Sequence, residues 1–167
     1  MIQVFLALSL FLAQAGTFEI VSVNIRTESV EFLLPPGFTP SFSGSADGPV
    51  TLTNFNDQYV NGGIIPPDGV KMTISTWKKT GTLRDLISRD TENKVFTESV
   101  VNLTDRNGTK VVTVDSSPEI RLTTATVYVE GKEVFYKIFL TYHTYNPKAE
   151  AYEEFFKGFL YSIKFLK

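Results

Sequence analysis

The stretch that decides the fold is residues 133–163, which read EVFYKIFLTYHTYNPKAEAYEEFFKGFLYSI. The first part alternates, and its uninterrupted apolar side consists of Val134, Tyr136, Ile138, Leu140 and Tyr142. Such alternation is typical of a strand with one face in the core. The second part carries an aromatic face at helical spacing, made of Tyr152, Phe155, Phe156, Phe159 and Ile163. A helix of this kind is stable only when packed, so we expect it to lie against the sheet that contains the strand.

The start of this helix has a specific sequence signal. Asn146 can cap the helix, and Pro147 suits the first helical position because its missing N–H would have no partner there. The opposite, solvent-facing side is predicted to carry Glu150, Glu153, Glu154 and Lys157.

Strand signals fill most of the chain before this stretch. Apolar, β-branched runs predict strands at 18–25, 30–34, 50–55 and 70–77. Two hairpins are predicted, one pairing 95–103 with 109–114 across Asn107-Gly108, the other pairing 120–129 with 133–143 across Glu130-Gly131. The Gly-, Pro- and Asn-rich segment from Pro40 to Pro67 is expected to be mostly a long surface loop, which is a common place for function.

A short helix is predicted between these strands. Thr82 can act as its N-cap with Asp85 three residues on, and Leu83, Leu86 and Ile87 form its apolar stripe. The elements together predict an α+β domain over residues 16–167, with a central antiparallel sheet flanked by helices.

The first fifteen residues are typical of a targeting signal. Residues 4–12 form an apolar run that is too short to span a bilayer, and Ala13-Gln14-Ala15 offers a small-x-small cleavage site. We therefore predict a signal peptide at residues 1–15 and a periplasmic or extracellular mature protein without a stable membrane anchor. The alternative is that this run is a buried N-terminal strand or helix of the domain.

Composition excludes several classes of partner and chemistry. The net charge is −2 and the Lys and Arg residues form no basic stripe, so a nucleic-acid partner is not expected. The chain has no cysteine, which excludes disulfides, zinc–thiolate sites and cysteine nucleophiles. An exported protein without disulfides must be held together by packing.

No catalytic, metal-binding or cofactor-binding set emerges from the sequence. The single histidine, His143, is expected at the surface end of a strand, and no Gly-x-Ser-x-Gly motif is present. Glu153 and Glu154 are neighbours on a predicted solvent face and cannot face each other across a cleft. We therefore expect no enzyme activity and no cofactor.

Three aromatic residues are candidates for a binding surface, where Trp and Tyr are enriched. They are Phe55, Tyr59 and Trp77. The alternative for each is a role in packing of the core or of a loop.

Three segments together resemble the PsbP-like family, which includes the DcrB-type envelope proteins and the Mog-type Ran-binding proteins. Residues 30–38, VEFLLPPGF, are similar to the family's opening strand, with Phe38 in place of its Trp. The second segment is the short helix at 82–86, and the third is the final strand and helix, closing in FLYSIKF at 159–165. The resemblance covers residues 18–166 and implies an α/β/α sandwich that binds proteins without chemistry.

Three hypotheses about function follow. The first is an exported, non-enzymatic domain that binds another protein through a sheet face or the Pro40 to Pro67 loop. The second is a carrier with an apolar pocket between the sheet and the C-terminal helix, lined by Phe155, Phe156 and Phe159. The third is an unrecognised hydrolase.

Overall fold

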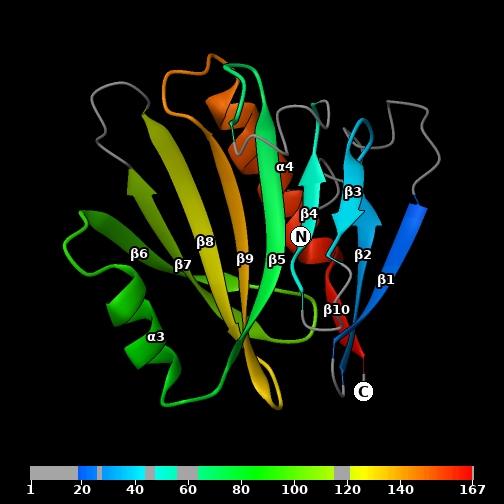
Figure 1. Cartoon of the computed structure of the whole chain (residues 1–167), viewed down its shortest axis with the longest axis vertical. Coiled ribbons are helices and arrows are strands. Elements are labelled where there is room, and N and C mark those ends of the chain that lie inside the picture. The colour runs from blue at the N-terminus through cyan, green and yellow to red at the C-terminus, as the bar shows by residue number, and fades with distance from the viewer. Residues whose placement is uncertain (1–18, 26–27, 44–47, 56–63, 115–120, 167) are drawn as a thin grey trace, which may run out of the picture.

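The computed structural model describes residues 19–25, 28–43, 48–55, 64–114 and 121–166 (Figure 1). Its strands are β1 (Glu19–Ile25), β2 (Glu28–Leu34), β3 (Thr39–Phe42), β4 (Val50–Thr53), β5 (Val70–Lys78), β6 (Phe96–Asn102), β7 (Asn107–Val114), β8 (Leu122–Glu130), β9 (Val134–His143) and β10 (Lys164–Leu166). Its helices are α3 (Leu83–Asp90) and α4 (Ala149–Ser162). The α+β class predicted from the sequence is confirmed.

Seven strands form the main sheet, in the order β3-β4-β5-β9-β8-β7-β6, and every neighbouring pair is antiparallel. β9 lies in the middle between β5 and β8. The predicted alternation of β5 is confirmed, since Val70, Met72 and Ile74 are buried in the core on one side. Trp77 lies on the other side, opposite Phe135 of β9.

A second sheet joins the two ends of the described chain. It has the order β1-β2-β10, so β10 pairs with β2 although the two are far apart in sequence. We expected residues up to 165 to continue the last helix, but α4 ends at Ser162 and residues 164–166 are extended. Pairing with β2 buries Phe165 against Tyr136, with ring centroids 4.8 Å apart, which a continued helix would not provide.

Helices cover both faces of the main sheet, as predicted. α4 lies behind β5 and β9 in Figure 1, and Phe156 and Phe159 join the larger core there. α3 packs on the opposite face, where Leu86 and Ile87 contact Phe135 in a smaller core.

The aromatic face of α4 is packed as predicted, and it leaves the hypothesised carrier pocket filled. Phe159 is 2% exposed and meets the edge of Phe32 on β2, with centroids 5.4 Å apart. Phe155 stacks on Phe38 at 5.0 Å. These residues therefore act as core side chains instead of lining a ligand cavity.

The first hairpin forms, but its predicted turn is wrong. Asn107 and Gly108 lie inside β7, and the chain reverses at residues 103–106, where the N–H of Leu103 donates to the carbonyl of Arg106 at 2.9 Å. This register buries Leu103, and burial of side chains on one face specifies the register of paired strands. Gly108 is needed for a different reason: a Cβ there would lie 2.7 Å from Cγ1 of Val127.

The second predicted turn is nearly correct. β8 ends at Glu130 and β9 begins at Val134, so Glu130-Gly131 opens a slightly longer turn. The N–H of Gly131 donates to the carbonyl of Val134 at 2.9 Å.

Helix α4 begins two residues later than its sequence signal predicts. The amide of Asn146 is held by the loop before β5, because Nδ2 donates to the carbonyl of Pro67 at 2.6 Å. Its Oδ1 accepts from the N–H of Lys148 at 2.8 Å, which closes a turn ahead of the helix. The helix therefore starts at Ala149, and Lys148 occupies the N-cap position without a capping hydrogen bond from its side chain.

The segment from Pro40 to Pro67 is less of a loop than predicted. Thr39–Phe42 forms β3 at the edge of the main sheet, where Pro40 is tolerated because edge strands need fewer donors. β4 confirms the predicted strand at its start but ends at Thr53.

The predicted signal peptide, residues 1–15, lies outside the described residues. Within the described ranges, no helix has the length and apolar character needed to cross a membrane.

A first prediction tests the packing of α4. Phe159→Ala should lower the free energy of unfolding by about 3–5 kcal/mol, because it removes a buried ring and leaves a cavity that the neighbouring side chains only partly fill. Denaturant unfolding followed by circular dichroism measures the change. Glu154→Ala, an exposed position on the same helix, is the matched control and should leave the midpoint nearly unchanged. Equal stability of the two variants would contradict the packing described here.

Candidate binding site around Trp77

Trp77 lies on the α3 side of the sheet, and of the two candidates that the structure describes it keeps the larger exposed fraction. It comes near the end of β5, and 42% of its surface is exposed. The guanidinium of Arg89, from α3, lies 5.5 Å from the ring centroid, and Nζ of Lys137, from β9, lies 4.9 Å from it. An indole between two cations is a favourable cation–π arrangement.

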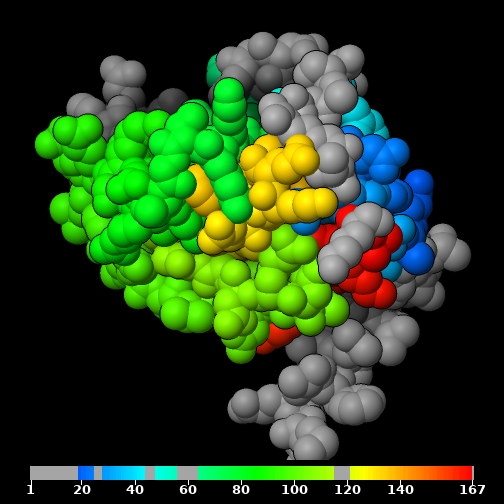
Figure 2. Space-filling model, turned by 90° about the horizontal axis from the view of Figure 1, so that it is seen from below, coloured from blue at the N-terminus to red at the C-terminus, as the bar shows by residue number. Residues whose placement is uncertain are grey.

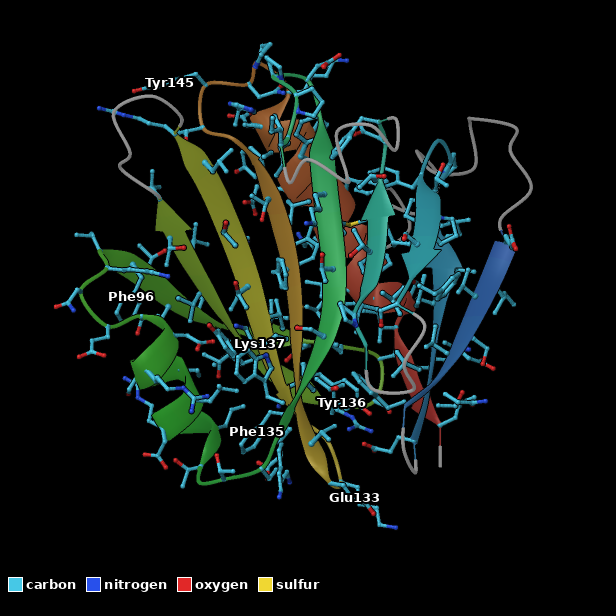
Figure 3. All side chains as sticks on the ribbon, viewed as in Figure 1. Phe96, Glu133, Phe135, Tyr136, Lys137 and Tyr145 are labelled. Carbon is cyan, nitrogen blue, oxygen red and sulfur yellow. The ribbon has the colours of Figure 1, made fainter. Side chains whose placement is uncertain are left out.

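The position of Lys137 is fixed by an ion pair. Its Nζ lies 2.7 Å from Oδ2 of Asp90, and both side chains are mostly buried. The hydroxyl of Tyr128 donates to the same carboxylate oxygen at 3.2 Å. Burial, and then the negative charge of Asp90, raise the pKa of Tyr128 well above its usual value, so this hydroxyl remains protonated. Figure 3 shows Phe135 and Lys137 close together beside α3.

The capping of α3 fixes Arg89 relative to Trp77. Thr82 and Asp85 form the predicted capping box: the N–H of Asp85 donates to Oγ1 of Thr82 at 3.1 Å, and the N–H of Thr82 donates to Oδ2 of Asp85 at 2.8 Å. At the other end, the hydroxyl of Thr91 donates to the carbonyl of Ile87 at 2.8 Å. Both ends of this short helix are therefore tied down.

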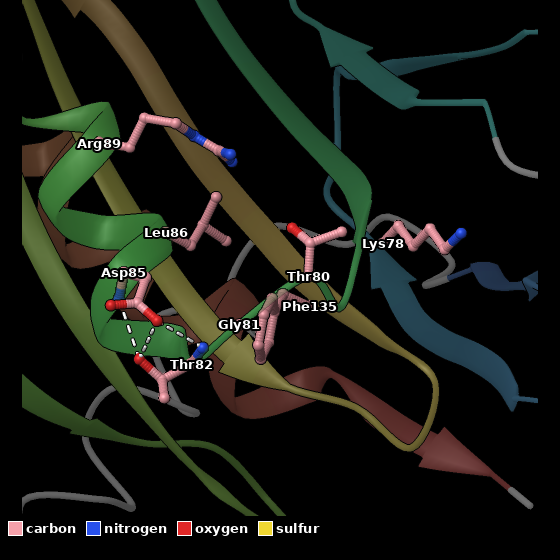
Figure 4. A pocket seen from close by; sticks show the side chains of 8 residues that line it. All are labelled: Lys78, Thr80, Gly81, Thr82, Asp85, Leu86, Arg89 and Phe135. Carbon is pink, nitrogen blue, oxygen red and sulfur yellow. Dashed lines mark hydrogen bonds between the residues drawn. The ribbon is translucent and has the colours of Figure 1, made fainter.

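A small cavity of about 50 Å³ lies between the first turn of α3 and the end of β5 (Figure 4). It is lined by Lys78, Thr80, Gly81, Thr82, Asp85, Leu86, Arg89 and Phe135. Pockets for small molecules usually enclose about 300–1,000 Å³, so this one has room for only a water molecule or two.

The one carboxylate in this cavity serves the helix cap. Hydrogen bonds from the N–H of Thr82 and then from its hydroxyl hold the pKa of Asp85 below its usual value. An acid that stays ionised and is bonded to a cap is poorly suited to donate or accept a proton in catalysis.

The other two candidate residues do not join Trp77. Phe55 follows β4 and lies beside Gly69, at the start of β5, whereas Trp77 is near the end of that strand. Seven residues of extended chain separate Val70 from Trp77, which corresponds to about 23 Å. Tyr59 lies outside the described residues. The predicted surface of three aromatics is therefore not a single surface.

His143 lies at the end of β9, as predicted. It is half-buried, and its Nε2 donates to the carbonyl of Ile65 at 2.7 Å. The partner is a main-chain group, and the described ranges contain no group of three His, Cys, Asp or Glu residues able to hold a metal ion.

Glu153 does not lie on the solvent side of α4 as predicted. Its carboxylate pairs with Nζ of Lys110 at 2.6 Å and accepts from the hydroxyl of Tyr142 at 3.1 Å. Burial and the charge of Glu153 raise the pKa of Tyr142 to about 12. The contact links α4 to β7 and β9, and it is consistent with a structural role.

Sequence reasoning missed Arg89 and Lys137 as parts of the site. The alternation of β9 places Lys137 on the face of Phe135, but only the pairing of Trp77 with Phe135 brings it to the indole. That register joins strands 58 residues apart, and no local pattern in the sequence reports it.

The sequence and the structure of the chain were compared with those of known proteins. No family model matches the sequence, and no curated protein matches it. Three solved structures are similar at low identity. The chain shares the fold of LpqN and Mog1p.

LpqN of Mycobacterium tuberculosis is described as involved in cell envelope biogenesis; it matches with a TM-score of 0.56 and 9% identity, over 91% of this chain and 93% of its own. The Ran-binding protein Mog1p of Saccharomyces cerevisiae matches with a TM-score of 0.52 and 8% identity, over 89% of this chain and 96% of its own. A protein of Bacteroides thetaiotaomicron matches with a TM-score of 0.54 and 11% identity over 83% of this chain. This chain spans only 45% of that protein. At these identities the likeness concerns the fold alone.

A second prediction concerns the cap that orients the site. Because the pKa of Asp85 is lowered in the folded state, the cap stabilises the protein above the unfolded pKa, near 3.8, and this contribution is lost as the pH falls through the folded value. Thr82→Ala removes the hydroxyl and should move the pKa of Asp85 back toward 3.8, measured by NMR titration of its side chain.

Thr80→Ala is the matched control, because Thr80 lines the same cavity without a hydrogen bond to Asp85. The two variants should differ in the Asp85 titration. If the pKa of Asp85 in both variants equals that of the wild type, the Thr82 hydroxyl does not contribute to it.

Proposed function

We propose that this chain is an exported, non-enzymatic protein-binding domain related to the PsbP-like proteins, and that it binds its partner through Trp77. The observation that carries the proposal is a large, partly exposed indole held between two cations. Trp and Arg are the residues that most often carry the binding energy of protein interfaces.

The setting of Trp77 supports a role in binding. A partner that covered the ring would exclude water, and cation–π attraction strengthens when it is desolvated. Both ends of α3 are capped and Lys137 is held by Asp90, so the side chains around the indole are already ordered. Binding therefore costs little conformational entropy at this site.

Charge suggests the chemistry of the partner. Arg89 forms no ion pair with another described residue, while the charge of Lys137 is neutralised by Asp90. The surface beside Trp77 thus keeps an excess of positive charge. We infer that the partner presents an acidic segment next to an apolar side chain that covers the indole.

Several features support a function without chemistry. The cavity at the first turn of α3 is too small for a substrate, and its carboxylate belongs to a helix cap. His143 is bonded to a main-chain carbonyl. The fold neighbours with described roles include a Ran-binding protein, which is a protein with a protein partner.

Export is supported by two observations. Residues 4–12 form an apolar run that precedes Ala13-Gln14-Ala15. In addition, the similar fold of LpqN belongs to a protein involved in cell envelope biogenesis.

A third prediction tests the binding site. Tagged wild-type protein, Trp77→Ala and Arg89→Gln should be compared in capture from extracts of the native host. Proteins captured by the wild type should be lost with Trp77→Ala, because the covered aromatic surface is gone. Arg89→Gln should weaken capture, and raised salt should weaken wild-type capture too, because salt screens exposed charges.

Tyr145→Ala is the matched control. Tyr145 is 74% exposed and also has an arginine over its ring, since Arg121 lies 5.7 Å from the centroid. Figure 3 shows Tyr145 near the upper end of the sheet, well away from Lys137. Equal loss of capture in the Tyr145 and Trp77 variants, or no loss in either, would contradict a specific role for Trp77.

A fourth prediction tests export. Signal peptidase should remove residues 1–15, so protein purified from the native host should begin at Gly16. Intact-mass measurement identifies the N-terminus directly. A mass that includes residues 1–15 would overturn the export proposal and favour the alternative of a structural N-terminal segment.

A further inference from the structure

The two edges of the main sheet differ in how well they are protected. β3, at one edge, has four residues and contains Pro40, which cannot donate to an added strand. β6, at the other edge, has seven residues, FTESVVN, with no proline, lysine or arginine. Proteins usually protect long edge strands with such residues, because an open edge accepts another strand. Figure 2 shows the light-green β6–β7 hairpin at the surface of the molecule.

The direction of the backbone groups of β6 follows from its turn. Leu103 forms a hydrogen-bonded pair with Arg106, and hydrogen-bonded and non-hydrogen-bonded pairs alternate along antiparallel strands. The main-chain groups of 97, 99 and 101 therefore face β7. Those of Phe96, Glu98, Val100 and Asn102 face outward. No other described residue forms a hydrogen bond with these outward groups.

The side chains of β6 also lack cover. Val100 is 76% exposed, and Val95, immediately before the strand, is 92% exposed. The one charged residue, Glu98, is neutralised within the molecule, since its two oxygens lie 2.8 and 2.6 Å from Nη1 of Arg84. An incoming strand therefore meets exposed apolar and uncharged polar side chains and no net charge.

We propose that β6 pairs antiparallel with β6 of a second copy of this chain, about a two-fold axis at Ser99. In this register Glu98 lies opposite Val100 of the second copy, and Phe96 lies opposite Asn102. All four outward residues then exchange hydrogen bonds with the second copy, and no like charges are directly opposite. Ser99 lies opposite Ser99 in a non-hydrogen-bonded pair. The two main sheets become one continuous sheet.

A second copy of the chain is the proposed partner because β6 is complementary to itself in this antiparallel register. A register moved by one residue along each copy, with the axis at Val100, would pair Glu98 with Asn102 but leave Phe96 without a partner residue in β6. A strand edge alone buries less than the roughly 1,200 Å² of a standard interface. The dimer should therefore dissociate on dilution.

The absence of cysteine from the chain permits a direct test. Residues in a non-hydrogen-bonded antiparallel pair have Cα atoms about 4.5 Å apart, which is within the range of about 4.4–6.8 Å for disulfides. Ser99→Cys should form a covalent dimer on mild oxidation of the full mature chain. Ser41→Cys, on the protected edge strand β3, is the matched control and should remain largely monomeric. A mixture of Thr97→Cys and Val101→Cys should form the crosslinked heterodimer.

Removing a backbone N–H that points outward from β6 should abolish pairing between the two copies while the fold of each copy is kept. Val100→Pro removes an N–H that faces away from β7, so far-UV circular dichroism should be retained. Analytical ultracentrifugation over a range of concentrations should show the wild type doubling in mass, whereas Val100→Pro should stay monomeric. Val100→Lys is a second variant that keeps the N–H but adds a charge to the edge, and it should also be monomeric.

The proposal is overturned if the wild type is monomeric at every concentration. It is also overturned if Ser99→Cys crosslinks no faster than Ser41→Cys, or if adding Val100→Pro to Ser99→Cys leaves crosslinking unchanged. A dimer that forms without the Ser99 crosslink would assign self-association to another surface and would equally reject pairing through β6.

Discussion

Burial of β9 on both of its faces is the constraint on which the rest of the structure depends. Tyr136, Ile138 and Leu140 are fully buried on the side of α4, and Phe135 is buried on the side of α3. A central strand of this kind requires cover on both faces, so both helices and the second sheet are needed for one strand to be stable. Without disulfides, this packing is what holds the described domain together. The same strand carries Lys137, so the candidate site is fixed by the most deeply buried element of the fold.

A single buried carboxylate ties the second sheet to the turns of the main sheet. Glu28, at the start of β2, accepts hydrogen bonds from the hydroxyl of Tyr136 at 3.1 Å and from the N–H of Lys132 at 3.0 Å. Arg106, in the turn before β7, lies 3.5 Å from the same carboxylate and 4.0 Å from the ring centroid of Phe165. Burial and the charge of Glu28 raise the pKa of Tyr136, so its hydroxyl stays a donor. The network joins β2, β10 and two hairpin turns. The desolvation cost of burying the Glu28 carboxylate is offset because it is paired with a cation and accepts hydrogen bonds.

The sequence predicted the elements whose signals are local, and it failed where distant parts of the chain decide. The alternation of β5, the Thr82–Asp85 cap and the aromatic face of α4 each lie within a short window, and each is confirmed. The Asn107-Gly108 turn was wrong, because the chain already reverses at residues 103–106, in the register that buries Leu103. β10 was missed because three residues carry no periodic signal, and its strand character arises from pairing with β2. The site shows the same division: Trp77 was a candidate from its residue type, whereas Arg89 and Lys137 become its neighbours only through tertiary contacts.

Trp77 and the open edge at β6 lie on different parts of the main sheet. Trp77 lies on the face covered by α3, where β5 and β9 meet, whereas β6 lies at the edge and is separated from β9 by two strands, β8 and β7. α3 contacts both regions, because its Arg89 flanks Trp77 and its Arg84 holds Glu98 of β6. The pairing of Arg84 with Glu98 takes one cation out of the surface beside α3 and removes the one charge from the edge strand. Through Arg84, α3 neutralises the one charge of the edge strand, and through Arg89 it keeps a positive charge beside Trp77.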